Sequence, residues 1–84
     1  MKREQIRRQA LNALHHLAQA YEKNGDLTGA LSVAWRLVDL EPWSEESHRY
    51  LMRLLGLNGQ RSAALTQYET CRRILAEELS VEPS

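Results

Sequence analysis

A chain of 84 residues that is 43% hydrophobic, with four glycines, two prolines and no phenylalanine, forms one small domain, and its many Leu and Ala residues favour helix over sheet. Eleven Lys and Arg residues balance eleven Asp and Glu residues, which excludes a strongly basic surface that holds nucleic acid through many phosphates. No apolar run approaches the roughly 18 residues of a membrane span. Together with the single Cys71, which excludes an internal disulfide, this leads us to expect a cytoplasmic protein without a signal peptide or a membrane helix.

The first predicted helix extends from about Ile6 to Tyr21. Its apolar residues recur every three or four positions, which is the spacing of one helix face. They are Ile6, Ala10, Ala13, Leu14, Leu17 and Tyr21. Asn24 and Gly25 then end the helix. Both flanks of this Asn-Gly pair keep the helical period, which indicates a helix stop and not a hairpin turn.

The same spacing predicts a second helix that Thr28 is placed to cap and that Pro42 closes. Its apolar residues are Leu27, Ala30, Leu31, Ala34, Leu37, Val38 and Leu40. A third helix opens at the N-cap Ser44, which is followed by two acidic residues that favour a helix start, and passes through Leu51, Leu54 and Leu55.

Asn58 and Gly59 end the third helix, and Ser62 is placed to cap a fourth that ends near Ser80. The apolar residues of the fourth helix are Ala64, Leu65, Tyr68, Cys71, Ile74, Leu75 and Leu79. The sequence thus predicts four antiparallel helices.

Two stretches, NGDLTGAL from Asn24 and NGQRSAAL from Asn58, are similar at an offset of 34 residues. A unit of helix, turn and helix with this period is that of the tetratricopeptide repeat. We therefore predict an all-α, tetratricopeptide-like right-handed superhelix of about four antiparallel helices. It forms a single domain over residues 1–84, with repeats at about 11–44 and 45–78.

Small residues occur where this repeat brings paired helices close together. Ala18, Ala30 and Ala64 are expected at positions where a branched side chain would overpack the contact. The second unit departs from the pattern at Met52 and lacks the terminal Pro at Ala76, so it is expected to be an atypical end unit.

The stretch EPWSEESHRYLMRLLGLNGQRSAALTQYETCRRILAEELSVEPS, from Glu41 to Ser84, resembles the bacterial transcriptional activator domain of Streptomyces antibiotic regulatory protein (SARP) type regulators. That family commonly reads E-x-x-H-R-x-L-M-x-L, then G-x-x-x-x-A-L-x-x-Y-E-x-x-R-x-x-L-x-x-E-L-x-x-x-P-S. The matching residues here are Glu45, His48, Arg49, Leu51, Met52, Leu54, Gly59, Ala64, Leu65, Tyr68, Glu69, Arg72, Leu75, Glu78, Leu79, Pro83 and Ser84. The amino-terminal half, with REQIRR and GDLTGALSVAWRLVDLEP, also follows the family. The chain departs from it at Trp35, Cys71 and Ser80.

This resemblance implies a non-catalytic domain for protein–protein interaction and oligomerisation within a longer transcriptional activator. A winged-helix domain ahead of it would contact DNA, so that this chain meets DNA only indirectly. Its expected partners are the DNA-binding domain, the transcription machinery and a second copy of itself. Because repeat domains need about three units to cover their faces, we expect an exposed apolar edge that is buried in a homodimer.

The first helix of each tetratricopeptide unit lines the concave groove. The corresponding positions in this chain are Asn12, His15, Gln19 and Glu22 from the first unit, and Glu46, Arg49 and Arg53 from the second. Arg49 and Arg53 lie one helical turn apart, and one interpretation is a cationic patch for an acidic segment of a partner. The alternative is a solvated face whose charges pair within the chain.

The two tryptophans are candidate interface residues, since large aromatic side chains dominate binding hot spots. Trp43 follows Pro42 and is expected to staple the second helix to the third by packing near Leu51, with an interface role as the alternative. For Trp35, which stands where the family usually has a polar residue, packing and interface roles stay equally open.

No group of residues indicates a metal, a cofactor or catalysis. His15 and His16 are adjacent and point to different faces, and His48 belongs to another helix, so they do not form a ligand pair. Cys71 is expected to be a small core residue. Nothing resembles a nucleophile with its base or a phosphate-binding loop, and an enzyme is therefore not expected.

Two further functions stay open. A free-standing tetratricopeptide adaptor would dock a partner peptide in its concave groove. Direct DNA binding through a helix-turn-helix interpretation of the same helices would use the basic opening, Lys2, Arg3, Arg7 and Arg8, which a solvated helix start explains equally well.

Overall fold

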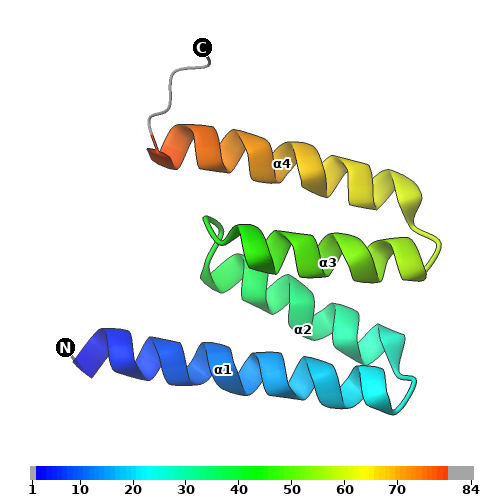
Figure 1. The fold of residues 1–84 in the computed structure, drawn as a ribbon, viewed down its shortest axis with the longest axis horizontal. Coiled ribbons are helices and arrows are strands. Elements are labelled where there is room, and N and C mark those ends of the chain that lie inside the picture. The colour runs from blue at the N-terminus through cyan, green and yellow to red at the C-terminus, as the bar shows by residue number, and fades with distance from the viewer. Residues whose placement is uncertain (1, 80–84) are drawn as a thin grey trace.

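Four α-helices joined by short turns make up the fold in the computed structural model, which describes the backbone of residues 2–79 and the side chains of residues 7–77. The helices are α1 (Lys2–Lys23), α2 (Leu27–Leu40), α3 (Glu45–Leu57) and α4 (Arg61–Leu79). Successive helices are antiparallel, and each packs on the next one along the chain (Figure 1). They form a thin slab of 43 × 39 × 14 Å. The predicted all-α, tetratricopeptide-like class is confirmed.

The two Asn-Gly pairs end helices in the same way. Gly25 and Gly59 both have φ of 75°, a left-handed conformation that glycine adopts without steric cost. The N–H of Gly25 donates to the carbonyl of Glu22 at 3.0 Å, and that of Gly59 donates to Gly56 at 3.1 Å. These bonds satisfy carbonyls that a helix end would otherwise leave unpaired. The predicted helix stops and their repetition are confirmed.

Two predicted helix caps are wrong. Helix α2 begins at Leu27, and its N-cap is Asp26, whose carboxylate accepts from the N–H of Gly29 at 2.9 Å, so Thr28 lies inside the helix. Helix α4 begins at Arg61, which places Ser62 inside that helix too. The reason is the same in both turns, because a single residue separates the left-handed glycine from the next helix.

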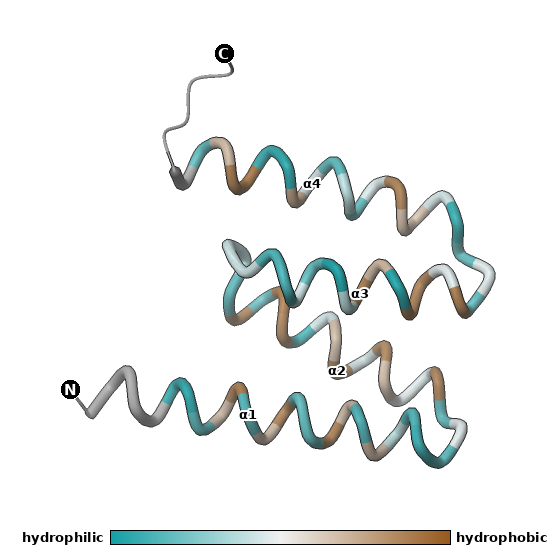
Figure 2. The backbone as a smooth tube through the Cα atoms, viewed as in Figure 1, coloured by the Kyte–Doolittle hydropathy of each residue, from teal (hydrophilic) through white to brown (hydrophobic). Residues whose placement is uncertain are grey.

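The core consists of two clusters that meet at α2. Ala18, Val33 and Leu37 join α1 to α2. The second cluster joins α2 to α3 and reaches α4 through the half-buried Ala63 and Ala64; its buried members are Ala30, Leu31, Ala34, Val38, Leu51, Leu54 and Leu55. Hydrophobic residues accordingly follow one another closely along α2 (Figure 2). Ala18 and Ala30 are fully buried at their helix contacts, and Cys71 is buried as predicted.

Several residues predicted on apolar faces are exposed. Leu17 on α1, and Leu65 and Tyr68 on α4, present about half or more of their surface to solvent. Ala10 and Ala13 on α1 are exposed as well. The backbones of α1 and α4 each lie close to a single neighbouring helix, whereas those of α2 and α3 each lie close to two. Helical spacing shows which apolar residues share a helix face. It does not show whether another helix covers that face.

Candidate interaction groove

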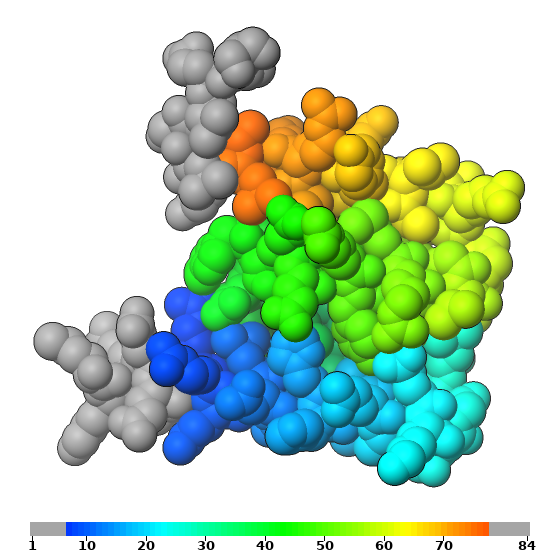
Figure 3. Space-filling view, in the orientation of Figure 1, coloured from blue at the N-terminus to red at the C-terminus, as the bar shows by residue number. Residues whose placement is uncertain are grey.

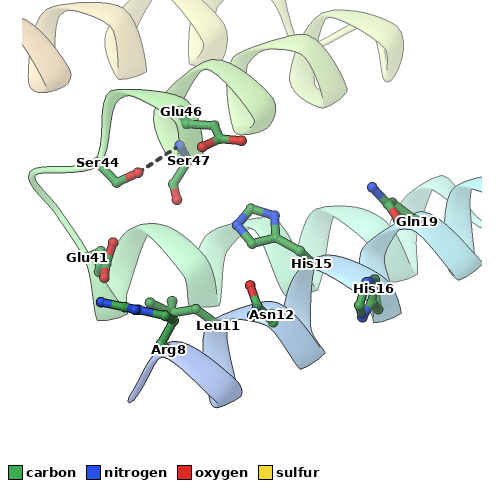
Figure 4. A pocket seen from close by; sticks show the side chains of 10 residues that line it. All are labelled: Arg8, Leu11, Asn12, His15, His16, Gln19, Glu41, Ser44, Glu46 and Ser47. Atoms are coloured by element: carbon green, nitrogen blue, oxygen red, sulfur yellow. Dashed lines mark hydrogen bonds between the residues drawn. The ribbon is translucent and has the colours of Figure 1, made fainter. Parts of the chain in front are cut away.

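A groove of about 440 Å³ opens between α1 and the start of α3 (Figure 4). The side chains that line it are Arg8, Leu11, Asn12, His15, His16 and Gln19 from α1, and Glu41, Ser44, Glu46 and Ser47 from the α2–α3 turn and the first turn of α3. We call it the α1–α3 groove. The structure brings four of the predicted groove residues together, namely Asn12, His15, Gln19 and Glu46.

Helix periodicity positions the α1 wall of the groove. Asn12, His15 and Gln19 are separated by three and four residues, so they share one face of the helix. The side chains of Asn12 and His15 point from α1 towards the first turn of α3 (Figure 4). Because the amides of Asn12 and Gln19 each offer a donor and an acceptor, this wall can pair with both kinds of polar group.

The opposite wall is held by the cap of α3. The Ser44 hydroxyl accepts a hydrogen bond of 3.2 Å from the N–H of Ser47, which confirms Ser44 as the N-cap (Figure 4). Ser47 itself is buried, and Glu46 lies beside it in the first turn. This cap connects the polar lining of the groove to the backbone of α3.

Beyond Gln19, a polar cluster links α1 directly to α3. The Tyr50 hydroxyl donates to a carboxylate oxygen of Glu22 at 2.8 Å. The Arg53 guanidinium contacts both oxygens of the same carboxylate, at 3.1 and 3.3 Å, and lies over the Tyr50 ring at 5.2 Å. His15 packs beside this ring, with the two ring centroids 6.5 Å apart.

The cluster shifts two pKa values in opposite directions. The hydrogen bond from Tyr50 and those from Arg53 hold the pKa of the Glu22 carboxyl below its usual 4.5. Burial, and then the Glu22 carboxylate, raise the pKa of Tyr50 to about 12. At neutral pH the cluster therefore combines a carboxylate, a neutral phenol and a guanidinium.

The two predicted groove arginines do not form one cationic patch. Arg53 is paired with Glu22, whereas Arg49 is paired with Glu45 at 2.5 Å on its own helix. Arg49 also lines a different pocket, of about 270 Å³, between α3 and α4. The two arginines share one face of α3 but take different partners, and both charges are balanced by acids within the chain.

The Trp43 side chain lies beside α1 and does not staple a core. It is half-exposed, and the guanidinium of Arg7 lies 4.8 Å from the centre of its ring. The same guanidinium donates to the carbonyl of Leu40 at 2.6 Å, the last residue of α2. The predicted packing near Leu51 is replaced by this contact because the turn directs Trp43 towards the start of α1. Trp35 is half-exposed on α2.

One buried polar contact, made by His48, was not predicted from the sequence. His48 is fully buried, and its Nε2 lies 2.6 Å from the Pro42 carbonyl while its Nδ1 lies 2.7 Å from the amide nitrogen of Gln67. A carbonyl only accepts, so Nε2 carries the proton and Nδ1 accepts from Gln67. This contact connects the α2–α3 turn to α4. The sequence signal was a histidine at a position where the repeat expects an apolar residue.

The described side chains offer little for catalysis. Among residues 7–77, no group of three or more His, Cys, Asp or Glu side chains is arranged to hold a metal ion. Burial, and then the Glu45 carboxylate, raise the pKa of the Cys71 thiol, which keeps it protonated and unreactive. No helix in the described part of the chain combines the length and the apolar character that a bilayer crossing needs.

Stacked antiparallel helices with a polar groove place the molecule in the class of tetratricopeptide-like helical repeat domains. Within that class, the chain belongs to the family of bacterial transcriptional activator domains, whose family model matches residues 1–84. This domain occurs in SARP-type regulators, and the family is one of transcription-regulator domains and not of enzymes. Comparisons with curated proteins and with solved structures found no match.

Proposed function

We propose that this domain is the non-catalytic interaction and self-association module of a SARP-type activator. It works in the cytoplasm and connects a DNA-binding domain to the transcription machinery through the α1–α3 groove. The single observation that carries the proposal is the groove itself, in which Asn12 and His15 point towards the capped start of α3 and Gln19 continues the same wall. Membership of the bacterial transcriptional activator domain family supports a role in transcriptional activation.

The spacing along the α1 wall fits a segment of extended chain. Asn12 and Gln19 are seven residues apart, which corresponds to about 10 Å along the helix. An extended peptide covers that distance in about three residues. The two amides can each pair with a peptide group of such a segment, because a side-chain amide donates and accepts at once.

Charges within the groove favour a segment without strong net charge. Arg8 and Glu41 both line one end of the groove, Glu46 lies on the α3 side, and the nearby Arg53 is neutralised by Glu22. The expected partner is therefore a polar, extended segment, recognised mainly by its backbone. A strongly acidic peptide is disfavoured, because Arg49 and Arg53 are both already paired with acids of this chain.

The same groove supports a second candidate, a free-standing adaptor that docks a partner peptide without any link to DNA. The two candidates differ in what groove variants change. In an activator, a groove variant lowers transcription from a promoter to which the domain is tethered. In an adaptor, it changes peptide binding alone.

A reporter assay with the domain fused to a heterologous DNA-binding module tests the proposal. The fusion is expected to raise transcription in a bacterial host, and the double variant Asn12→Ala with Gln19→Ala is expected to lose most of that gain. Gln9→Ala, an exposed glutamine on α1 outside the groove, is the matched control and should keep it. Full activation by the folded double variant would exclude the groove as the working surface.

A further inference from the structure

The two repeats place equivalent residues in opposite environments. On α2, Leu31 is 8% exposed and Ala34 is fully buried, because α3 covers them. The residues 34 positions later, on α4, are Leu65 and Tyr68, which are 64% and 50% exposed. Together with the exposed Arg72, which is equivalent to Val38, they form what we call the α4 free face. This face is the surface on which a further helix would pack in the repeat.

Helix α1 lies at the opposite edge of the slab from α4 (Figure 3). Ala13, Leu17 and Ala20 on α1 are all exposed, and they share one side of the helix. Their equivalents on α3 are Ser47, Leu51 and Leu54, which are all buried in the packing of α3 against α2 and α4. We call Ala13, Leu17 and Ala20 the α1 free face.

The two free faces differ in side-chain volume from the equivalent faces of α2 and α3, and the two differences have opposite signs. The α4 free face is bulkier than its α2 counterpart, because Tyr68 replaces Ala34 and Arg72 replaces Val38. The α1 free face is smaller than its α3 counterpart, because Ala20 replaces Leu54. A close-packed helix contact requires that added volume on one side is offset by volume removed on the other. The two faces of this chain meet that requirement for each other.

Arg72 does not prevent burial of the α4 free face. Its guanidinium lies 6.0 Å from the centre of the half-exposed Tyr68 ring. A long arginine can keep its charged head in water at the rim of a contact while its stem is covered.

We propose that a second copy of this chain docks head to tail, with its α1 free face on the α4 free face of the first copy, in the arrangement in which α3 packs on α2. The inference rests on the self-association in the proposed function and names its geometry. Such a contact is heterologous, because the two surfaces differ, and each added copy presents a new α4 free face. The result is an open chain of copies and not a closed dimer.

Sedimentation velocity of the 84-residue chain, from about 10 μM to about 1 mM, tests the proposal. The wild type is expected to grow beyond a dimer as its concentration rises. Leu17→Glu disables the α1 free face and Leu65→Glu disables the α4 free face, so each variant alone should stay monomeric. Both positions are already exposed, and circular dichroism checks that the variants fold.

Mixing the two variants gives the sharpest result. Leu17→Glu keeps an intact α4 free face and Leu65→Glu keeps an intact α1 free face, so an equimolar mixture should form a one-to-one dimer and stop there. The matched controls are Leu57→Glu and Trp35→Glu, since both residues are exposed and lie on neither face. They should assemble like the wild type.

Two outcomes would overturn the head-to-tail contact, and they differ in what they leave of the proposed function. A closed dimer that Leu17→Glu does not weaken would show self-association through another surface. A chain that stays monomeric up to the highest concentration would end the self-association and would assign the α4 free face to a helix from another source. The groove would then be judged by the reporter assay alone.

Discussion

The Tyr50 hydroxyl on α3 donates a 2.8 Å hydrogen bond to the Glu22 carboxylate on α1, across 28 residues of sequence. The backbones of α1 and α3 do not approach each other closely, although α2 packs on both of them. This hydrogen bond and the Arg53–Glu22 ion pair therefore hold the two walls of the α1–α3 groove at a set separation. Changes in the cluster should alter both stability and groove geometry.

Alkaline pH should destabilise the domain through Tyr50. Its pKa rises from 10.0 to about 12 on folding, so the folded state keeps the phenol neutral where the unfolded chain ionises. The stabilisation is complete below about pH 10 and is lost as the pH rises towards about 12. Urea unfolding across this range should show a free energy of unfolding that falls more steeply for the wild type than for Tyr50→Phe. Tyr68→Phe is the control, and an equal fall in all three proteins would contradict the prediction.

Acid should act on the same cluster through Glu22. Because its pKa is lowered on folding, its carboxylate stabilises the folded state above the usual pKa of 4.5, and this contribution disappears as the pH falls through the lowered value. Glu22→Gln should therefore reduce stability at neutral pH and flatten the loss of stability in acid. Thermal unfolding from neutral to acidic pH measures both effects. Glu45→Gln, which removes a solvent-exposed pair with Arg49, should keep the wild-type acid response.

Gln67→Met should destabilise the domain more than its volume change suggests. The amide of Gln67 satisfies Nδ1 of the fully buried His48, and methionine leaves that nitrogen without a donor. An unsatisfied buried polar atom costs about 1–3 kcal/mol. Gln19→Met, at an exposed position on α1, is the control and should change the free energy of unfolding by less than about 0.5 kcal/mol. Equal stabilities of the two variants would mean that the contact with His48 contributes nothing.

Two glycines within helices should respond to alanine with opposite signs. A Cβ at Gly29 would lie 2.6 Å from the Tyr21 ring and 2.7 Å from the Asp26 carboxylate, so Gly29→Ala must push α1 and α2 apart or displace the N-cap. Overpacking of this kind costs about 1–3 kcal/mol. A Cβ at Gly56 meets nothing within 4 Å, and Gly56→Ala should add about 0.5–1 kcal/mol through helix propensity. Denaturant titration compares the two, and a stabilising Gly29→Ala would refute the close contact.

Most helix ends could be predicted from the sequence because their signals are local. The Asn-Gly stops and the cap at Ser44 act within a few residues, through backbone hydrogen bonds and the left-handed conformation of glycine. The caps predicted at Thr28 and Ser62 are wrong because both residues lie just inside their helices. Serine and threonine are favourable N-caps, but their presence does not fix the residue at which a helix begins. The residue types alone do not indicate that the next helix begins only two positions after Gly25 and Gly59.

The groove was predicted in part for a related reason. Helical spacing places Asn12, His15 and Gln19 on one face, and the repeat pattern assigns that face to the concave side. Arg49 and Arg53 also share one helix face, yet Arg49 pairs with Glu45 on its own helix, whereas Arg53 pairs with Glu22 on α1. The spacing of residues along a helix does not show which charged neighbours another helix brings.

The equivalent residues Leu31 and Leu65 show what the sequence by itself determined and what only the tertiary structure decided. Both follow the same Asn-Gly stop in the same repeat pattern, and the sequence by itself determined that each lies on an apolar helix face. Only the packing of α3 decided that Leu31 is buried while Leu65 stays open. Helix formation depends on hydrogen bonds between residues four apart, whereas burial depends on which other helix lies alongside, and that is a property of the assembled fold.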